Sequence, residues 1–239
     1  MLKKFLKIQN FDKNFNFFLP ILLIILVITF IATFNAIISS PIDYQQGNAV
    51  KIMYIHVPCA WMAILIYTLM ASFNLAGFIW KNRFFYVAAR AMAEIGGIYC
   101  LITLLTGSIW GKPIWGTWWA WDARLTSMLI LFFLYCGYLL VFDNTENRIK
   151  AEKISAIIAI VGFVNIPIIK FSVEYWNSLH QKASILRKGG IAIDNAFLKP
   201  LFLAFICYFC IFVIATFMRI KIAIMKQKIA SIKLKNHNL

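Results

Sequence analysis

The chain carries little charge and very few acidic residues. Only 14% of its 239 residues are charged and nine are Asp or Glu, whereas 62% are hydrophobic. This composition excludes an intrinsically disordered chain and argues against an ordinary soluble domain. The formal net charge of +15 does not indicate nucleic-acid binding. Lys and Arg cluster between and beyond long apolar runs, where they set the orientation of membrane proteins.

Other features are sparse or missing. The five cysteines fall in apolar runs and suggest no disulfide framework. No internal repeat is present, which argues against an inverted-repeat transporter. Cys207 and Cys210 form a C-x-x-C motif, but both lie in the middle of an apolar run. Thiol–disulfide exchange needs an accessible thiolate at an aqueous face, so we expect these cysteines to serve as small packing residues.

Long apolar runs recur along the whole chain. A spanning helix needs about 20 mostly apolar residues, so we predict an all-α integral membrane protein with one domain over residues 1–239. The six expected spans are 17–38, 52–79, 84–109, 125–142, 154–169 and 200–218. The segments 110–124 and 170–199 are predicted as loops on the outer side.

The basic residues predict the orientation in the membrane. With both termini in the cytoplasm, or in the mitochondrial matrix, sixteen of the 24 Lys and Arg residues lie on that side. This bias agrees with the positive-inside rule. The sequence therefore predicts a multi-pass protein of the bacterial inner membrane or, alternatively, of the mitochondrial inner membrane.

Five of the eight tryptophans fall within one twelve-residue window. The window runs Trp110-Gly-Lys-Pro-Ile-Trp-Gly-Thr-Trp-Trp-Ala-Trp121 and is followed by Asp122 and Arg124. Interfacial tryptophans are common in membrane proteins, but such dense clustering favours a surface for a flat, aromatic ligand. Asp122 and Arg124 could orient polar groups of that ligand or of a partner.

Two of the three histidines lie on the predicted outer side with this window. His237 belongs to a basic tail and is interpreted as solvated, whereas His56 and His180 border apolar segments. A single histidine in such a place is more often a packing residue than a ligand. Two imidazoles beside an indole cluster, however, are what a bis-histidine heme site needs. The cations expected to pair with heme propionates are Lys112, Arg124, Lys182, Arg187 and Lys188.

Three segments of the chain resemble, in order, segments of the CcmC family of heme exporter proteins. Trp115-Gly-Thr-Trp-Trp-Ala-Trp-Asp-Ala-Arg-Leu-Thr126 resembles the "WWD" signature of heme-handling proteins. Lys51-Ile-Met-Tyr-Ile-His-Val-Pro58 resembles the segment with the first heme-ligand histidine, and residues 164–181 resemble the segment with the second. The length and the six-span layout also fit. Tyr175 stands where the family frequently has a second tryptophan.

The resemblance implies a function in cytochrome c maturation. Proteins of this family hold heme b at the outer face between two axial histidines, here His56 and His180. They present it to the heme chaperone CcmE and work with an ABC-type ATPase, its membrane subunit and a small single-span subunit, named CcmA, CcmB and CcmD. The resemblance thus implies a heme-binding and transfer protein rather than an enzyme. No Walker loop is present in the sequence, so any ATP hydrolysis belongs to a partner.

Residue roles follow from the same resemblance. Asp122 and Arg124 correspond to positions tied to chaperone interaction. The residues expected to contact heme are Trp115, Trp118, Trp119, Trp121 and Trp176. If residues 176–180 were helical, Trp176 would lie one turn before His180.

Other functions remain open at this stage. A heme permease would require polar or small residues along several spans, and few are present apart from Arg90 and Glu94. We interpret these two residues as an i,i+4 ion pair near the inner end of the third span. A membrane b-type cytochrome would need histidine pairs buried within the spans. A scaffold with an aromatic belt and no cofactor is the remaining alternative.

Overall fold

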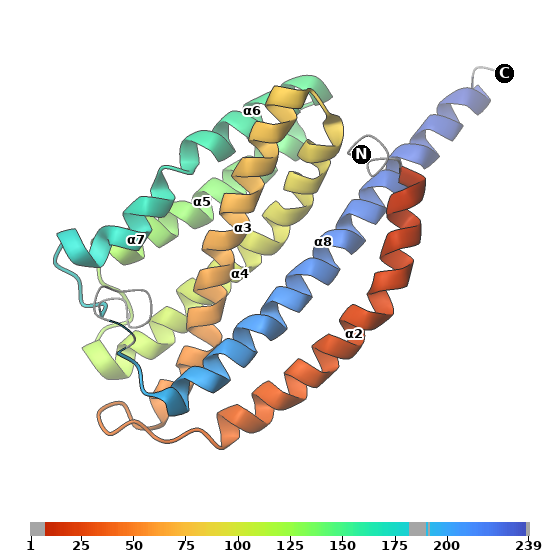
Figure 1. The fold of residues 1–239 in the computed structure, drawn as a ribbon. Coiled ribbons are helices and arrows are strands. Elements are labelled where there is room, and N and C mark those ends of the chain that lie inside the picture. The colour runs from red at the N-terminus through yellow and green to blue at the C-terminus, as the bar shows by residue number, and fades with distance from the viewer. Residues whose placement is uncertain (1–7, 182–189, 191, 238–239) are drawn as a thin grey trace.

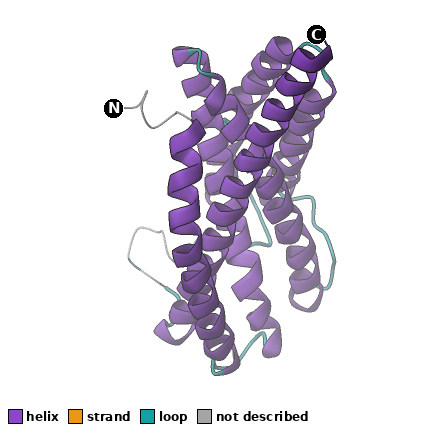
Figure 2. Ribbon diagram, turned by 90° about the vertical axis from the view of Figure 1, so that its right-hand side faces the viewer, coloured by secondary structure: helices purple, strands orange, loops and turns teal. Residues whose placement is uncertain are grey.

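A computed structural model describes residues 8–181, 190 and 192–237 of the chain. Within these residues the regular structure is helical, and no strand is formed beyond one isolated bridge between Asp43 and Gly47. Six segments are long and apolar enough to cross a membrane, which confirms the predicted all-α, six-span fold class. The helices run along one common direction (Figure 2).

The elements follow one another as an up-and-down bundle (Figure 1). They are α2 (Ile8–Ile38), the 3-10 helix η1 (Asn48–Ile52), α3 (Met53–Trp80), α4 (Arg83–Trp115), α5 (Ala123–Asn144), α6 (Arg148–Gly162), α7 (Asn165–Tyr175) and α8 (Asn195–His237). Helices α3, α4, α5 and α6 pack into the main body, α8 packs against α3 and α4, and α2 packs chiefly on α8.

The bundle has two ends with different elements. At one end, α4 stops, α5 begins, and the starts of α3 and α8 lie close by; we refer to it as the tryptophan end. At the other end lie the start of α2 and the end of α8, and we refer to it as the terminal end (Figure 1). The candidate site is at the tryptophan end.

The core between the two ends consists of large side chains packed without exposure. Tyr67 and Tyr135 are fully buried, and their rings meet edge to face at 5.1 Å. The Tyr135 hydroxyl donates a hydrogen bond of 2.7 Å to the carbonyl of Ala63 and thereby joins α5 to α3. Gly96 lets this ring pass α4, because a Cβ there would lie 2.5 Å from Tyr135 Cζ.

The first loop boundary differs from the prediction. Helix α4 continues to Trp115, so Trp110 and Trp115 are helical and the loop contains only residues 116–122. Helix α4 passes through Gly111 and Pro113 and ends at Gly116, which adopts φ 75° and donates its N–H to the Lys112 carbonyl. A left-handed glycine is a common helix terminator.

The second loop and the fifth span also differ from their predicted bounds. The outer loop is shorter than 170–199, because α7 extends to Tyr175 and α8 begins at Asn195. The fifth span is broken into α6 and α7 at Phe163 and Val164. Pro167 explains the break, since it has no N–H to donate to the Phe163 carbonyl.

The two cysteines of the C-x-x-C motif lie within α8. Cys207 and Cys210 are both buried and unbridged. Burial in a spanning helix removes them from an aqueous face, as expected for packing residues.

Candidate ligand site at the tryptophan end

His56 and His180 face each other although they come from distant parts of the chain. His56 lies near the start of α3, and His180 lies in the segment that follows α7. Their ring centroids are 6.4 Å apart and the rings are inclined by 32°. A metal–imidazole bond is about 2 Å long, so two histidines this close together can both reach one metal ion.

The hydrogen bonds of both rings leave one nitrogen of each available. His56 Nδ1 lies 3.1 Å from the Thr103 carbonyl oxygen, and His180 Nδ1 lies 3.2 Å from the Gln181 carbonyl oxygen. A carbonyl oxygen only accepts, so each Nδ1 is the donor and each Nε2 keeps its lone pair. Fixing the tautomer in this way is typical of metal-binding histidines.

His56 packs against one face of α4. Thr103, Thr106, Gly107 and Trp110 follow the i, i+3, i+4, i+7 spacing of a helix face. Thr106 Oγ1 lies 3.2 Å from His56 Nδ1, and the Trp110 ring meets the imidazole edge-on at 5.7 Å. A Cβ at Gly107 would lie 2.8 Å from His56 Cε1, so the absence of a side chain there lets the ring approach α4.

The tryptophans do not form a single slab. Trp115 lies beside His180, with ring centroids 6.1 Å apart. Trp119 and Trp121 meet edge to face at 5.6 Å. Trp118 and Trp121 are 56% and 79% exposed. The cluster therefore has an inner part against the histidines and an outer part that presents open indole surface.

Two positions of this cluster behave unexpectedly. Trp176 is exposed and its backbone is extended, so the chain has left the helix before His180 and the one-turn spacing from Trp176 is not realised. The Trp119 indole N–H is buried and has no hydrogen-bond partner among the described residues. An indole N–H usually finds a partner when it is buried, so Trp119 holds an unused donor at the site.

Asp122 connects the start of α5 to the segment that carries His180. Its Oδ1 caps α5 by accepting from the Leu125 N–H at 2.7 Å, while its Oδ2 accepts from the Ser178 hydroxyl at 2.5 Å. The same Ser178 oxygen accepts from the backbone N–H of His180 at 3.0 Å. Both carboxylate oxygens thus have partners inside the chain.

A positive charge lies close to His180. Burial, and then the positive charge of Arg124, lower the pKa of His180 below its ordinary value. The imidazole therefore stays neutral under mildly acidic conditions. Lys112 lies near the Trp118 ring, 6.0 Å from its centroid. The other predicted cations, Lys182, Arg187 and Lys188, lie outside the described residues.

The sequence pattern had singled out the histidines and tryptophans but not their supports. Thr103, Thr106, Gly107 and Ser178 were not identified. The first three are recognisable in the sequence, because they form a stripe of small and polar residues on an otherwise apolar helix. Trp110 continues this stripe. Ser178 is not recognisable from the sequence, because its contacts depend on how the segment after α7 folds back.

Comparison with known proteins gives a consistent result. Residues 1–235 match the family model described as heme exporter protein C. Heme exporter protein C of Bradyrhizobium diazoefficiens is 43% identical over 195 residues, which cover 82% of this chain and 74% of that protein. The Haemophilus influenzae protein of the same name is 44% identical over 190 residues, or 79% of this chain and 76% of its own. A putative cytochrome c biosynthesis ccmC-like mitochondrial protein of Marchantia polymorpha is 44% identical over 178 residues, covering 74% of this chain and 75% of that protein.

Proposed function

The chain belongs to the heme exporter protein C family of cytochrome c maturation, and from this premise we propose that it holds heme b between His56 and His180 for transfer to the chaperone CcmE. The observation that carries the proposal is the pair of neighbouring imidazoles, with ring centroids 6.4 Å apart. Each has Nδ1 bonded to a carbonyl and, among the described residues, no hydrogen bond at Nε2. Heme is the cargo here, and its iron accepts two axial histidines.

The surrounding residues fit such a cargo. Trp110 and Trp115 flank the two imidazoles, and the exposed Trp118 and Trp121 offer apolar surface for a porphyrin. Arg124 and Lys112 are placed to pair with propionates. The unused indole donor of Trp119 adds a hydrogen bond for a polar edge of the cargo.

Asp122 acts in this proposal as a positioning residue. Its two oxygens hold the Leu125 N–H and the Ser178 hydroxyl, so its effect on heme passes through Ser178 to the backbone of His180. The family resemblance implied a role in chaperone interaction for Asp122 and Arg124. The hydrogen bonds of Asp122 favour a role in positioning His180 over a direct contact with the chaperone. We retain Arg124 as the candidate contact for the chaperone.

Transfer would use the outer part of the tryptophan cluster. Trp118, Trp121 and Trp176 are exposed at the same end as the histidines, and a partner could reach the heme edge there. In this scheme the tryptophan end lies at the outer membrane face, and both termini lie in the cytoplasm or matrix. Any ATP hydrolysis belongs to the ABC-type ATPase CcmA, which works with its membrane subunit CcmB and the small subunit CcmD. The chain itself binds the heme and hands it over. The iron–nitrogen bonds to His56 and His180 form on binding and break on transfer, and no covalent bond of the porphyrin changes.

The visible absorption spectrum of the detergent-purified protein tests this proposal. We expect the parent protein, co-expressed with CcmE, to show a sharp Soret band and split α and β bands on reduction, which are typical of bis-histidine heme. His56→Ala and His180→Ala should each lose most of this low-spin signal, because each removes one of two iron–nitrogen bonds.

His237→Ala is the matched control for this experiment. It removes the third histidine of the chain, which belongs to the basic tail, and should leave the spectrum unchanged. Bound heme with a spectrum indifferent to both His56→Ala and His180→Ala would refute the ligand assignment. Absence of heme from the parent protein, even after co-expression with CcmE, would favour the scaffold interpretation.

A further inference from the structure

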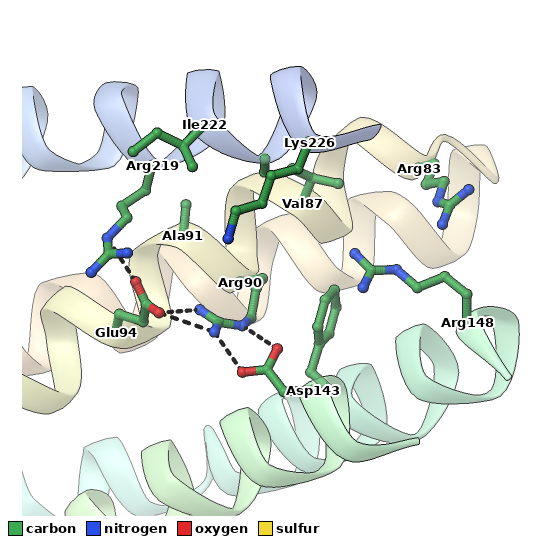
Figure 3. A pocket seen from close by; sticks show the side chains of 12 residues that line it. Arg83, Val87, Arg90, Ala91, Glu94, Asp143, Arg148, Arg219, Ile222 and Lys226 are labelled. Carbon is green, nitrogen blue, oxygen red and sulfur yellow. Dashed lines mark hydrogen bonds and ion pairs between the residues drawn. The ribbon is translucent and has the colours of Figure 1, made fainter. Parts of the chain in front are cut away.

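A network of ion pairs joins three helices at the terminal end, opposite the heme-site residues. Arg90 pairs with Glu94 at 3.0 Å, which confirms the predicted i,i+4 ion pair. The network is larger than predicted, because Arg90 also reaches Asp143 of α5 at 2.6 Å and Glu94 accepts Arg219 of α8 at 2.9 Å. Figure 3 shows these four side chains bridging α8, α4 and α5.

This network lines a groove with a volume of about 520 Å³. Helix α4 contributes Val87 and Ala91, and α8 contributes Ile222, so apolar side chains line it as well. Two carboxylates, Glu94 and Asp143, line the groove. Five basic residues do so: Arg83, Arg90, Arg148, Arg219 and Lys226.

Among the described residues, the carboxylates near the groove do not balance its basic residues. Both lining carboxylates, Glu94 and Asp143, are already in ion pairs with Arg90 or Arg219. Arg83 and Arg148 share one oxygen of Glu152, at 2.8 and 3.2 Å, and their side chains are 56% and 41% exposed. Within the described part of the chain, no carboxylate lies within ion-pair distance of Lys226. Arg83, Arg148 and Lys226 therefore leave unused donors around the open part of the groove.

The groove lies where the apolar spans give way to charged ends. The apolar run of α8 reaches Met218, and the next residues are Arg219 and then Lys221, Lys226 and Lys228. Figure 3 shows Lys226 extending from α8 toward α4. Basic pockets between helices at this depth are typical places for the headgroups of anionic lipids.

We propose that this groove binds the phosphate of an anionic phospholipid. Arg83, Arg148 and Lys226 hold the phosphodiester, and the apolar side chains of α4 and α8 contact the glycerol and the first methylenes of the acyl chains. A soluble phosphate ion would gain nothing from those apolar walls. An acidic protein segment would likewise leave the apolar walls without a partner. The observations therefore favour a lipid.

Native mass spectrometry in detergent, with added phosphatidylglycerol or phosphatidylcholine, tests the proposal. The variant Arg148→Gln/Lys226→Gln removes two groove cations and keeps Arg83 on the buried Glu152. We expect retained phosphatidylglycerol to fall roughly 30-fold, because each basic residue near a lipid headgroup contributes roughly fivefold. Phosphatidylcholine should bind weakly to both proteins.

Lys150→Gln/Lys153→Gln is the matched control. Both lysines are exposed on α6 near Arg148 but do not line the groove, and the variant loses the same charge. Equal loss of phosphatidylglycerol in the two variants would reduce the effect to general surface charge and overturn the proposal. Displacement of the lipid by millimolar inorganic phosphate, or by an acidic peptide at equal concentration, would also overturn it. The heme spectrum of both variants should match that of the parent, so this test is independent of the proposed function.

Discussion

At the scale of single residues, the protonation of His180 decides whether it can serve as a ligand. A histidine binds metal only when it is neutral. Burial and the charge of Arg124 lower the pKa of His180, so the free imidazole stays available as the pH falls through the ordinary histidine value of about 6.5. Protonation competes with binding only below this lowered pKa. Bound heme should therefore persist at mildly acidic pH and be released at lower pH.

Arg124→Gln tests this explanation through the pH of heme release. Without the neighbouring positive charge, the pKa of His180 rises toward its ordinary value, and the midpoint of heme release should move to higher pH. An acid titration followed at the Soret band measures the shift. Lys112→Gln removes the other cation placed to pair with propionates, but Lys112 is not a cause of the lowered pKa, so its midpoint should shift less than that of Arg124→Gln. Identical shifts in the two variants would show that propionate pairing, and not the pKa of His180, determines acid release.

A second prediction at this scale concerns the bond from Ser178 to Asp122. Ser178→Ala removes the acceptor of the His180 N–H but leaves Asp122 as the cap of α5. One hydrogen bond contributes about 1 kcal/mol, so heme affinity should fall roughly fivefold. The spectrum should acquire a high-spin component as His180 loosens, which a general loss of stability would not produce. Association with CcmE should be unchanged.

Asp122→Asn completes this test, because asparagine also caps helices well. We expect it to lower heme binding to a similar extent as Ser178→Ala. Normal heme binding combined with loss of CcmE capture in Asp122→Asn would contradict the positioning role and restore Asp122 as a direct partner contact.

At the scale of secondary-structure elements, the crossing of α3 and α4 sets the position of the first ligand. Gly107 faces His56, and a Cβ there would lie 2.8 Å from the imidazole. Gly107→Ala should displace the ring and lower heme occupancy several-fold, while the helix itself gains roughly 0.5–1 kcal/mol from replacing glycine. Heme content and thermal unfolding, measured together, separate the two effects.

Gly97→Ala is the control for this substitution. It lies in the same helix, and its Cβ would meet Tyr135 Cβ at an ordinary 3.6 Å. It should keep full heme occupancy at equal or slightly higher stability. If both variants retain heme, the close approach at Gly107 is not required for the position of His56.

The sequence predicts these elements well where one physical rule dominates. Apolar runs identified every spanning helix, because a bilayer requires length and hydrophobicity. Boundaries were less predictable. The predicted loop began at residue 110, yet α4 includes Pro113 and ends only at Gly116. The predicted span 154–169 was continuous, yet it is broken before Pro167. A proline removes one donor, and its neighbours decide whether the helix continues.

The site shows the same division between local pattern and tertiary arrangement. The tryptophan window and the two histidines stood out because indole and imidazole are rare in apolar runs. Their pairing depends on the fold: His180 reaches His56 because Ser178 and Asp122 tie the segment after α7 to the start of α5. No periodicity in the sequence encodes that contact.

At the scale of the whole molecule, the positions of the histidines and of the buried core argue against an electron carrier and against a heme permease. Both useful histidines lie at the tryptophan end, whereas a transmembrane electron carrier would place ligands at two depths. A permease would need a polar route between the ends. The centre of the described bundle instead holds buried Tyr67, Tyr135 and Tyr138.

Within the described bundle, polar side chains of that centre are hydrogen-bonded to backbone carbonyls. Buried Asn74 donates to the Met70 carbonyl at 2.8 Å in its own helix, and Ser155 donates to the Tyr138 carbonyl at 3.4 Å. A porphyrin with two propionates would have to separate these packed rings and leave such groups unpaired, which costs free energy for every donor exposed to a dry interior. The two ends of the protein are therefore better understood as separate binding surfaces. In our proposals the tryptophan end presents heme and the basic terminal end anchors lipid.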